Sequence, residues 1–334
     1  MSENNLINFS EKIFVAGSSG MVGSSVCRML NLCGYGNAAC DGKIFAPLRN
    51  ELDLLDTESV QNWFKSNKPT VVILAAAKVG GIYANTIYPG DFIFENLKIQ
   101  TNIIEAAWVN GVKRLIFLGS SCIYPKLAKQ PIAEDSLLTG ALEPTNEWYA
   151  ISKISGIKLC QALRKQYGFD AISLMPTNLY GTGDNYHEKN SHVMASLIRK
   201  FCTAVKFSEK EVLCWGTGNV FREFMHVDDL ARAIIFALER WDPDAPDAPT
   251  DKYNNPCTLI NVGTGKDISI KDLAHKISEK VSFKGKIIWD KNMPDGTPKK
   301  VLNIQKIRNL GWEPIINLDD GIDKTIGEFK KLIQ

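Results

Sequence analysis

Short apolar runs alternate with stretches of helical periodicity along the first half of the chain. The runs are rich in β-branched and aromatic residues, as expected of buried strands, and they are residues 13–16, 43–48, 70–74, 114–118 and 171–175. Between them, apolar positions recur every three or four residues over 22–30, 57–64, 91–109 and 149–167, with Asp56 as a helix N-cap. This alternation predicts an α/β fold with a doubly wound parallel sheet.

The pattern loosens beyond Pro176. Helical stretches are expected at 191–203, 227–240, 270–281 and 318–333, and short strands at 211–215 and 259–262. Residues 241–256 carry four prolines and are expected to form an exposed loop. We therefore predict two domains, residues 1–180 and a smaller α/β domain at 181–334, with some chain returning to the first.

Charge and composition argue against several classes of protein. The 39 Lys and Arg residues nearly balance the 37 Asp and Glu residues, which argues against a nucleic-acid binder. Residues 1–11 lack the pattern of a signal peptide, and the longest apolar run, 71–77, is too short to cross a membrane. Eight cysteines include no CxxC pair, so no metal site is expected. We expect a soluble cytoplasmic protein with reduced thiols.

A glycine-rich turn joins the first strand to the first helix, with the sequence Gly17-Ser18-Ser19-Gly20-Met21-Val22-Gly23. Such a turn either packs a helix tightly on a strand or also holds a dinucleotide pyrophosphate, and its position at the first strand favours a Rossmann-type cofactor site. The second strand ends near Arg49, with no acid until Glu51. Arg49 alone is better explained as a solvated side chain, but its place after the glycine turn favours NADP over NAD.

Tyr149 and Lys153 lie one helical turn apart, and Ser120 follows the fourth strand. A cation beside a phenol favours the phenolate and is expected to lower its pKa, while the serine hydroxyl can hold a carbonyl oxygen. YxxxK alone is more often a solvent-facing pair. In a chain that also has a dinucleotide-binding turn and a serine at the end of a strand, the same motif indicates carbonyl reduction.

Further motifs resemble the extended short-chain dehydrogenase/reductases, and among them the GDP-4-keto-6-deoxymannose 3,5-epimerase-4-reductases. The matching segments are residues 74–82, 119–126, 143–147, 175–181, 222–229 and 294–298. The resemblance implies C3/C5 epimerisation of GDP-4-keto-6-deoxy-D-mannose, then reduction of its C4 ketone by NADPH to give GDP-L-fucose. It also implies a homodimer, with NADP(H) bound by the first domain and the GDP-sugar by the second.

By the same resemblance, Cys122 is the epimerisation base, His192 the acid, and Ser120, Tyr149 and Lys153 serve the reduction. Taken alone, Cys122 is better explained as a buried structural thiol, and His192 as a helix cap or core residue; the position of Cys122 two residues after Ser120, in the loop facing the cofactor, reverses this for the cysteine. A thiolate base needs a lowered pKa, for which Lys126 or Lys153 is the expected source of charge.

Binding residues are expected in two groups. The cofactor group comprises Gly17, Ser18, Ser19, Gly20, Met21, Val22, Gly23, Arg49, Asn50, Glu51, Leu52, Asp53, Leu54, Leu118, Gly119, Ser120, Ser121, Lys153, Pro176, Thr177, Asn178, Leu179 and His192. The substrate group comprises Lys200, Trp215, Arg222 and Asp295.

Two features depart from the family pattern. The glycine turn has Ser19 where the family commonly has an arginine, which leaves Arg49 to hold a 2′-phosphate. Residues 32–42 form a longer connection than expected. Other nucleotide-sugar epimerases or dehydratases remain alternatives, although a dehydratase needs an acid beside Ser120. A non-catalytic NADP-binding regulator is the alternative from another class.

Overall fold

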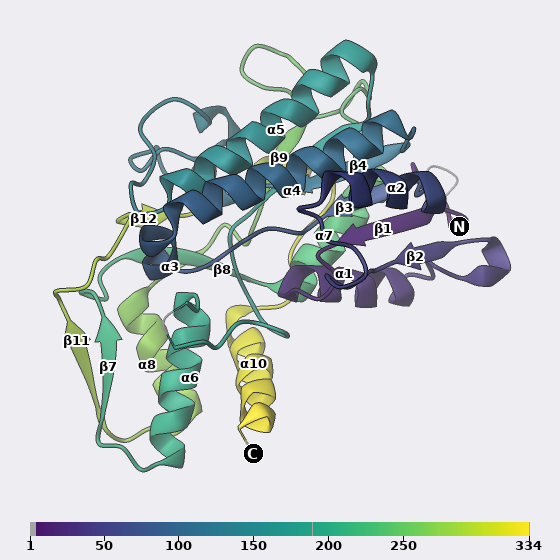
Figure 1. The fold of residues 1–334 in the computed structure, drawn as a ribbon. Helices are drawn as coiled ribbons and strands as arrows, with labels where there is room; N and C mark the ends of the chain where they lie inside the picture. Colours follow the sequence, from purple (N-terminus) through teal and green to yellow (C-terminus); the bar gives the residue numbers. More distant parts are fainter. Residues whose placement is uncertain (1–4, 189, 334) are drawn as a thin grey trace.

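A six-stranded parallel sheet forms the centre of the protein in the computed structural model, which describes residues 5–188 and 190–333 (Figure 1). Its strand order is β2-β1-β3-β4-β5-β9, and every neighbouring pair is parallel. The strands are β1 (Lys12–Ala16), β2 (Lys43–Phe45), β3 (Val71–Leu74), β4 (Arg114–Leu118), β5 (Ala171–Pro176) and β9 (Leu259–Val262). The predicted Rossmann-type fold is confirmed.

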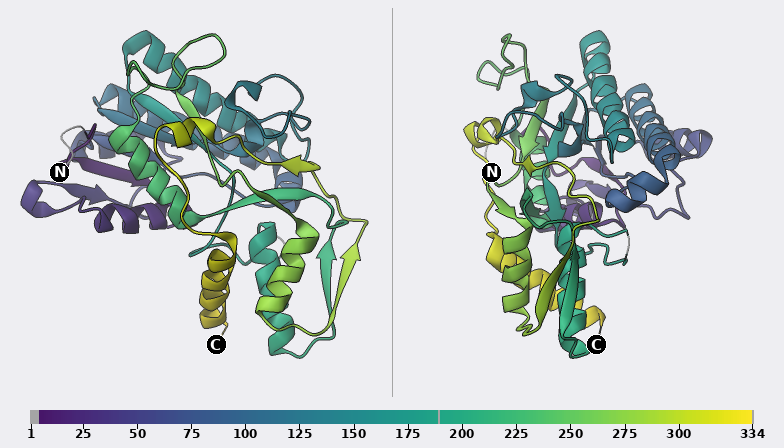
Figure 2. Two further views of the ribbon diagram at one scale, coloured as in Figure 1. Left: turned by 180° about the vertical axis from the view of Figure 1, so that it is seen from behind. Right: turned by 90° about the vertical axis from the view of Figure 1, so that its left-hand side faces the viewer.

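Helices cover both faces of this sheet (Figure 2). On one face α2, α4 and α5 pack side by side, and α1 packs against α7 on the other. Because β3, β4 and β5 are buried along their whole length, a nearly continuous apolar run suits them better than alternation. These helices are α1 (Met21–Leu32), α2 (Thr57–Asn67), α4 (Pro89–Val109), α5 (Glu147–Tyr167) and α7 (Val227–Arg240), and the short α3 (Ile82–Ile87) precedes α4.

A second unit lies below the carboxyl ends of the strands in Figure 1. It has its own apolar cluster, in which Phe201 and Leu273 are fully buried. Its helices are α6 (Val193–Lys206), α8 (Ile270–Lys280) and α10 (Leu318–Leu332). Its strands are β6 (Asn178–Tyr180), β7 (Glu211–Trp215), β8 (Phe221–His226), β10 (Asp267–Ser269), β11 (Lys286–Asp290) and β12 (Lys299–Lys300). The chain returns to the large sheet at α7, β9 and α9 (Gln305–Asn309).

Some local predictions need correction. The second strand ends at Phe45 rather than at residue 48, because Pro47 follows and cannot donate to a ladder. Trp241 opens the proline-rich loop yet is buried against the main core. The long connection at 32–42 is held to α7, since Tyr35 is buried and its hydroxyl donates to Glu239 Oε1 at 2.7 Å. Within the described residues, no helix has the length and apolar character of a membrane span.

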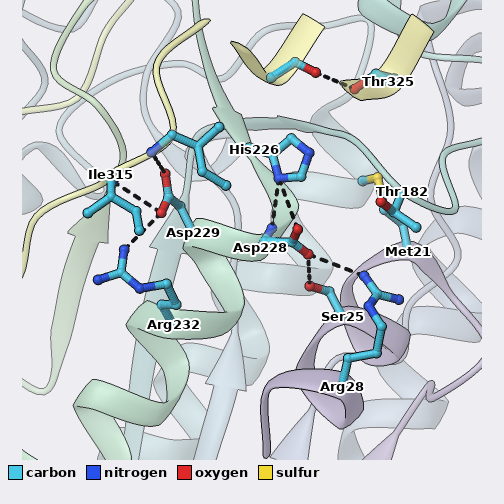
Figure 3. Close-up of polar contacts among 12 residues, drawn as sticks. Met21, Ser25, Arg28, Thr182, His226, Asp228, Asp229, Arg232, Ile315 and Thr325 are labelled. Carbon is cyan, nitrogen blue, oxygen red and sulfur yellow. Dashed lines mark hydrogen bonds and ion pairs between the residues drawn. The ribbon is translucent and has the colours of Figure 1, made fainter. Parts of the chain in front are cut away.

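Adjacent acids at the start of α7 join three parts of the molecule (Figure 3). Asp228 Oδ1 accepts hydrogen bonds from Ser25 Oγ at 2.7 Å and Arg28 Nη2 at 3.2 Å, both on α1. The fully buried Asp229 accepts from the backbone N–H groups of Ile315 and Ile316 at 3.2 and 2.9 Å. Helix α1 and the segment before α10 are thereby fixed to one turn of α7.

Asp229→Ala is expected to lower the free energy of unfolding by about 3 kcal/mol, because two backbone donors and Arg232 lose a buried acceptor. Urea unfolding followed by circular dichroism measures the change. The control is Asp323→Ala, which removes an exposed partner of Lys280 and is expected to cost less than about 1 kcal/mol. Equal losses in the two variants would contradict this assignment.

Candidate functional site

A cavity of about 660 Å³ opens at the carboxyl ends of the central strands. Its walls come from the loops after β1, β3, β4 and β5 and from the start of α5. Parallel α/β sheets bind ligands at this edge, because the loops there converge on one crevice. The described side chains at this edge therefore form the candidate active site.

The floor of the cavity is the glycine turn before α1. Gly17 has φ +85°, and a Cβ on it would lie 2.7 Å from Ala76 Cα on the neighbouring loop. A Cβ on Gly23 would lie 2.1 Å from the carbonyl oxygen of Gly17. Helix α1 begins after Gly20 with no side-chain cap, so its first N–H groups face the cavity without a side-chain acceptor. This geometry fits a dinucleotide pyrophosphate.

Most residues expected to bind a cofactor line the cavity, and three do not. Gly17, Ser19 to Gly23, Arg49, Leu52 to Leu54, Leu118 to Ser121, Lys153, Pro176 to Leu179 and His192 line it. Ser18 turns away, since its hydroxyl donates to the Ala46 carbonyl oxygen at 3.1 Å. Asn50 and Glu51 also lie outside the lining, and the Glu51 carboxylate accepts from Leu48 N–H at 2.7 Å. Arg49 is exposed at the cavity.

Ser120, Tyr149 and Lys153 meet on one wall. Lys153 is buried, its ammonium donates to the Leu118 carbonyl oxygen at 2.8 Å, and its Nζ lies 5.9 Å from the centroid of the Tyr149 ring. A hydrogen bond links the side chains of Tyr149 and Ser120. Helix α5 supplies the tyrosine and lysine at i and i+4, and the loop after β4 supplies the serine.

The sequence predicts a lowered pKa for Tyr149, and this prediction is wrong: its surroundings in the protein raise the pKa. Burial raises the pKa of Tyr149, as does the charge of Cys122, and the Ser120 hydrogen bond only partly opposes them. The same burial lowers the pKa of Lys153 to about 7. The lysine therefore loses part of its charge near neutral pH, and the phenol stays protonated.

Cys122 lies beside this wall, but its polar neighbours are not those expected. Lys126 pairs with Glu143 at 3.1 Å, and Lys153 faces a backbone carbonyl. Instead the Cys122 thiol accepts contacts from Asn146 Nδ2 at 3.5 Å and from Lys300 Nζ at 3.6 Å. Since 178 residues separate Lys300 from Cys122, no local motif indicates the contact.

His192 is the N-cap residue of α6 and lines the same cavity. Its ring is exposed to the open cavity, while the surrounding protein desolvates it and lowers its pKa, with a further contribution from the charge of Lys300. The neutral imidazole is thereby favoured. Lys300 is thus close enough to act on both Cys122 and His192.

The four residues expected to bind substrate lie outside the lining of this cavity, in the second unit. Lys200 Nζ donates to the Leu213 carbonyl oxygen at 2.6 Å and lies 5.4 Å from the centroid of the Trp215 ring. Arg222 Nη2 donates to the Asp295 carbonyl oxygen at 3.1 Å. The Asp295 carboxylate accepts from the Thr217 N–H and hydroxyl, each at 2.8 Å. The four therefore form two pairs.

Burial lowers the pKa of Arg222, and the charge of Cys122, which lines the cavity, partly opposes this effect. The segment 75–80 also lines the cavity, although it was quoted only as a motif and not as a binding segment. Its position after β3 is the signal that could have indicated a binding role, since that loop lies at the same edge of the sheet as the glycine turn.

Comparison with known proteins finds relatives among nucleotide-sugar enzymes. Residues 13–254 match the NAD dependent epimerase/dehydratase family. The chain is 50% identical over 322 residues to GDP-L-fucose synthase 1 of Arabidopsis thaliana, covering 96% of this chain and 94% of the relative. It is 48% identical over 315 residues to GDP-L-fucose synthase of Escherichia coli, covering 94% and 95%. The solved NADP-bound GDP-mannoheptose C4 reductase from Campylobacter jejuni is 35% identical, with a TM-score of 0.84 and coverage of 97% and 99%.

Lys153→Met is expected to remove a pH dependence of stability between pH 7 and about 10.4. In that window the unfolded chain keeps the lysine proton that the folded protein has lost, so the unfolding free energy of the natural protein rises with pH. Relative to Lys153→Met, it should rise by about 1.4 kcal/mol from pH 8 to pH 9. Denaturant titrations at both pH values measure the difference. Lys158→Met, an exposed change on the same helix, should leave the slope unchanged, and an unchanged slope in Lys153→Met would contradict the assignment.

Proposed function

This chain belongs to the NAD dependent epimerase/dehydratase family, and we propose that it converts GDP-4-keto-6-deoxy-D-mannose to GDP-L-fucose with NADPH as reductant. The observation that carries the proposal is the convergence of Ser120, Tyr149, Lys153, Cys122 and His192 on one cavity above a glycine cradle. It combines a carbonyl-reducing set with a thiol and an imidazole suited to proton transfer. The relatives named GDP-L-fucose synthase support the same reaction.

The cradle fits NADP(H). The approach of Gly17 to Ala76 leaves backbone N–H groups of α1 for the pyrophosphate. We assign the 2′-phosphate to Arg49, which is exposed and lines the cavity. The NADP-bound reductase from Campylobacter jejuni supports this choice. When bound, NADPH supplies the hydride that reduces C4 of the sugar.

Epimerisation requires proton removal at C3 and C5 and proton return on the opposite face of the ring. These protons are acidic because the C4 ketone holds the resulting charge as an enolate. Cys122, as thiolate, removes the proton, and His192 supplies one from the other side. The hydroxyls of Ser120 and Tyr149 donate to the enolate oxygen, as an oxyanion hole does.

Reduction uses the same two hydroxyls. Burial keeps the Tyr149 phenol protonated, so it can give its proton to the oxygen on C4 as the alkoxide develops. Ser120 holds that oxygen. Lys153, beside the ring, favours the phenolate left behind when it carries its charge, and it also binds the nicotinamide ribose.

The GDP portion of the substrate is assigned to the second unit. Arg222 is suited to a two-pronged contact with the diphosphate, while Trp215 offers a half-exposed ring and Lys200 an ammonium. Asp295 acts through its carboxylate, which is held by Thr217, and through its carbonyl oxygen, which holds Arg222.

A cytoplasmic homodimer completes the proposal. Phe94 on α4 is 65% exposed, and Trp148 and Ile151 on α5 are 41% and 37% exposed. The starts of these helices are adjacent, since the Phe92 and Tyr149 rings lie 6.4 Å apart. The apolar residues therefore share one helical surface that a second copy can cover. All eight cysteines are free thiols, as suits a reducing compartment.

Tyr149→Phe is expected to slow NADPH oxidation by about 10²–10⁴-fold, because the proton donor is lost.

Cys122→Ser should abolish deuterium uptake at C3 and C5 from heavy water, yet leave hydride transfer to the unepimerised ketone. NADPH absorbance follows reduction, and NMR of the sugar follows exchange. Cys33→Ser, an exposed thiol outside the cavity lining, should behave as the natural protein. Full exchange in Cys122→Ser would remove that cysteine from the mechanism.

Phe94→Glu combined with Ile151→Glu is expected to halve the sedimenting mass, since two charges would be buried in the proposed dimer contact. Sedimentation velocity measures the mass. Leu32→Glu changes a still more exposed apolar residue at the end of α1 and should leave the sedimenting mass unaltered. A natural protein that sediments as a monomer would refute the dimer.

A further inference from the structure

Strand β12 consists of two lysines that point in opposite directions. It pairs in parallel with β8, with Lys299 opposite Phe221 and Lys300 opposite Arg222. Successive side chains of a strand lie on opposite faces, and paired residues share a face. Lys300 and Arg222 therefore project together toward the Cys122 loop, whereas Lys299 projects away.

The contacts of the two lysines agree with this pleat. Lys300 Nζ lies 3.6 Å from Cys122 Sγ and is the charged group in hydrogen-bond contact with that thiol in the described structure. Lys299 Nζ instead pairs with Asp267 at 2.9 Å and lies over the Phe221 ring. Neighbouring lysines thus have different chemical surroundings.

We propose that Lys300 is a positioning residue for the epimerisation, which holds Cys122 as the thiolate base through its ammonium. The inference rests on the proposed function, since it assigns the cation that the thiolate base of that reaction needs. Asn146, whose Nδ2 lies 3.5 Å from the sulfur, orients the same atom without adding charge.

The other charged and titratable groups around the thiol do not supply this contact. Arg222 on β8 donates through its two Nη atoms to the carbonyl oxygens of Phe221 and Asp295. Tyr149 on α5 is a buried phenol that remains neutral. Lys126 is paired with Glu143. Lys300 is the cation left to face the sulfur directly.

Lys300 also acts on the partner acid. Its charge lowers the pKa of His192, in addition to the larger effect of desolvation. The same ammonium thus favours proton loss at His192 and contacts the sulfur of Cys122. Lys300 therefore contacts the proposed base directly and acts through its charge on the proposed acid.

The test measures the thiol without substrate. Iodoacetamide alkylation of Cys122 is followed against pH by peptide mass spectrometry, with exposed Cys40 as the internal reference. In Lys300→Met, alkylation of Cys122 at neutral pH should slow by about tenfold or more, because the thiolate loses the cation that contacts its sulfur. Lys300→Arg should retain most of the natural rate, and Lys299→Met all of it.

A second readout tests the link to catalysis. Deuterium uptake at C3 and C5 should slow in Lys300→Met by a similar factor and recover as the pH is raised, while hydride transfer changes little. Equal alkylation profiles in the natural protein and Lys300→Met, or an equal shift in Lys299→Met, would overturn the inference. Should Lys300→Met not fold, Lys300→Gln carries the same comparison against Lys300→Arg.

The proposed reaction and the coupling between Lys300 and Cys122 can be refuted separately. If no GDP-L-fucose forms but the alkylation profile still shifts in Lys300→Met, the proposed function is wrong and the Lys300–Cys122 coupling stands. If turnover occurs with an unshifted profile, the function stands and the coupling is wrong.

Discussion

The close approach of the glycine turn to the neighbouring loop is the constraint on which the rest of the site depends. With no room for a Cβ at Gly17 or Gly23, the start of α1 sits directly against the ends of β1 and β3. That contact sets the floor of the cavity and leaves the first helical N–H groups facing it. Asp228, bonded to Ser25 and Arg28 of α1, fixes the same helix from the other side (Figure 3).

Burial around this floor decides the proton chemistry. Burial in the protein raises the pKa of Tyr149 and lowers that of Lys153 to about 7. The phenol therefore stays protonated and can donate, and the lysine side chain is only partly protonated near neutral pH. The simple expectation of a lysine that ionises its tyrosine neglects the cost of burying either charge. In a low-dielectric site, hydrogen bonds from Ser120 matter more than the distant cation.

The hydrophobic pattern of the sequence predicted most helices and strands, because these elements depend on residues that are close in the chain. The helix at 227–240 and the strands at 114–118 and 259–262 have the predicted bounds, and Asp56 caps α2 as expected. What sequence could not provide was the pairing of distant segments. The contact between Lys300 and Cys122 depends on the β8–β12 register, and Ser18 points away because its hydroxyl finds the carbonyl of Ala46. Neither follows from periodicity.

The two proposed half-reactions draw on different parts of the fold. Ser120, Tyr149 and Lys153 all come from β4, α5 and the loop between them, within one unit. The groups assigned to epimerisation straddle the units, since Cys122 lies on that loop while His192 begins α6 and Lys300 lies on β12. A small displacement between the units would leave Ser120, Tyr149 and Lys153 together but separate the thiol from its cation. Both half-reactions need the GDP portion held by the second unit, but epimerisation also takes catalytic groups from it. Residues such as Asp229 that fix the position of that unit therefore bear on epimerisation more than on reduction.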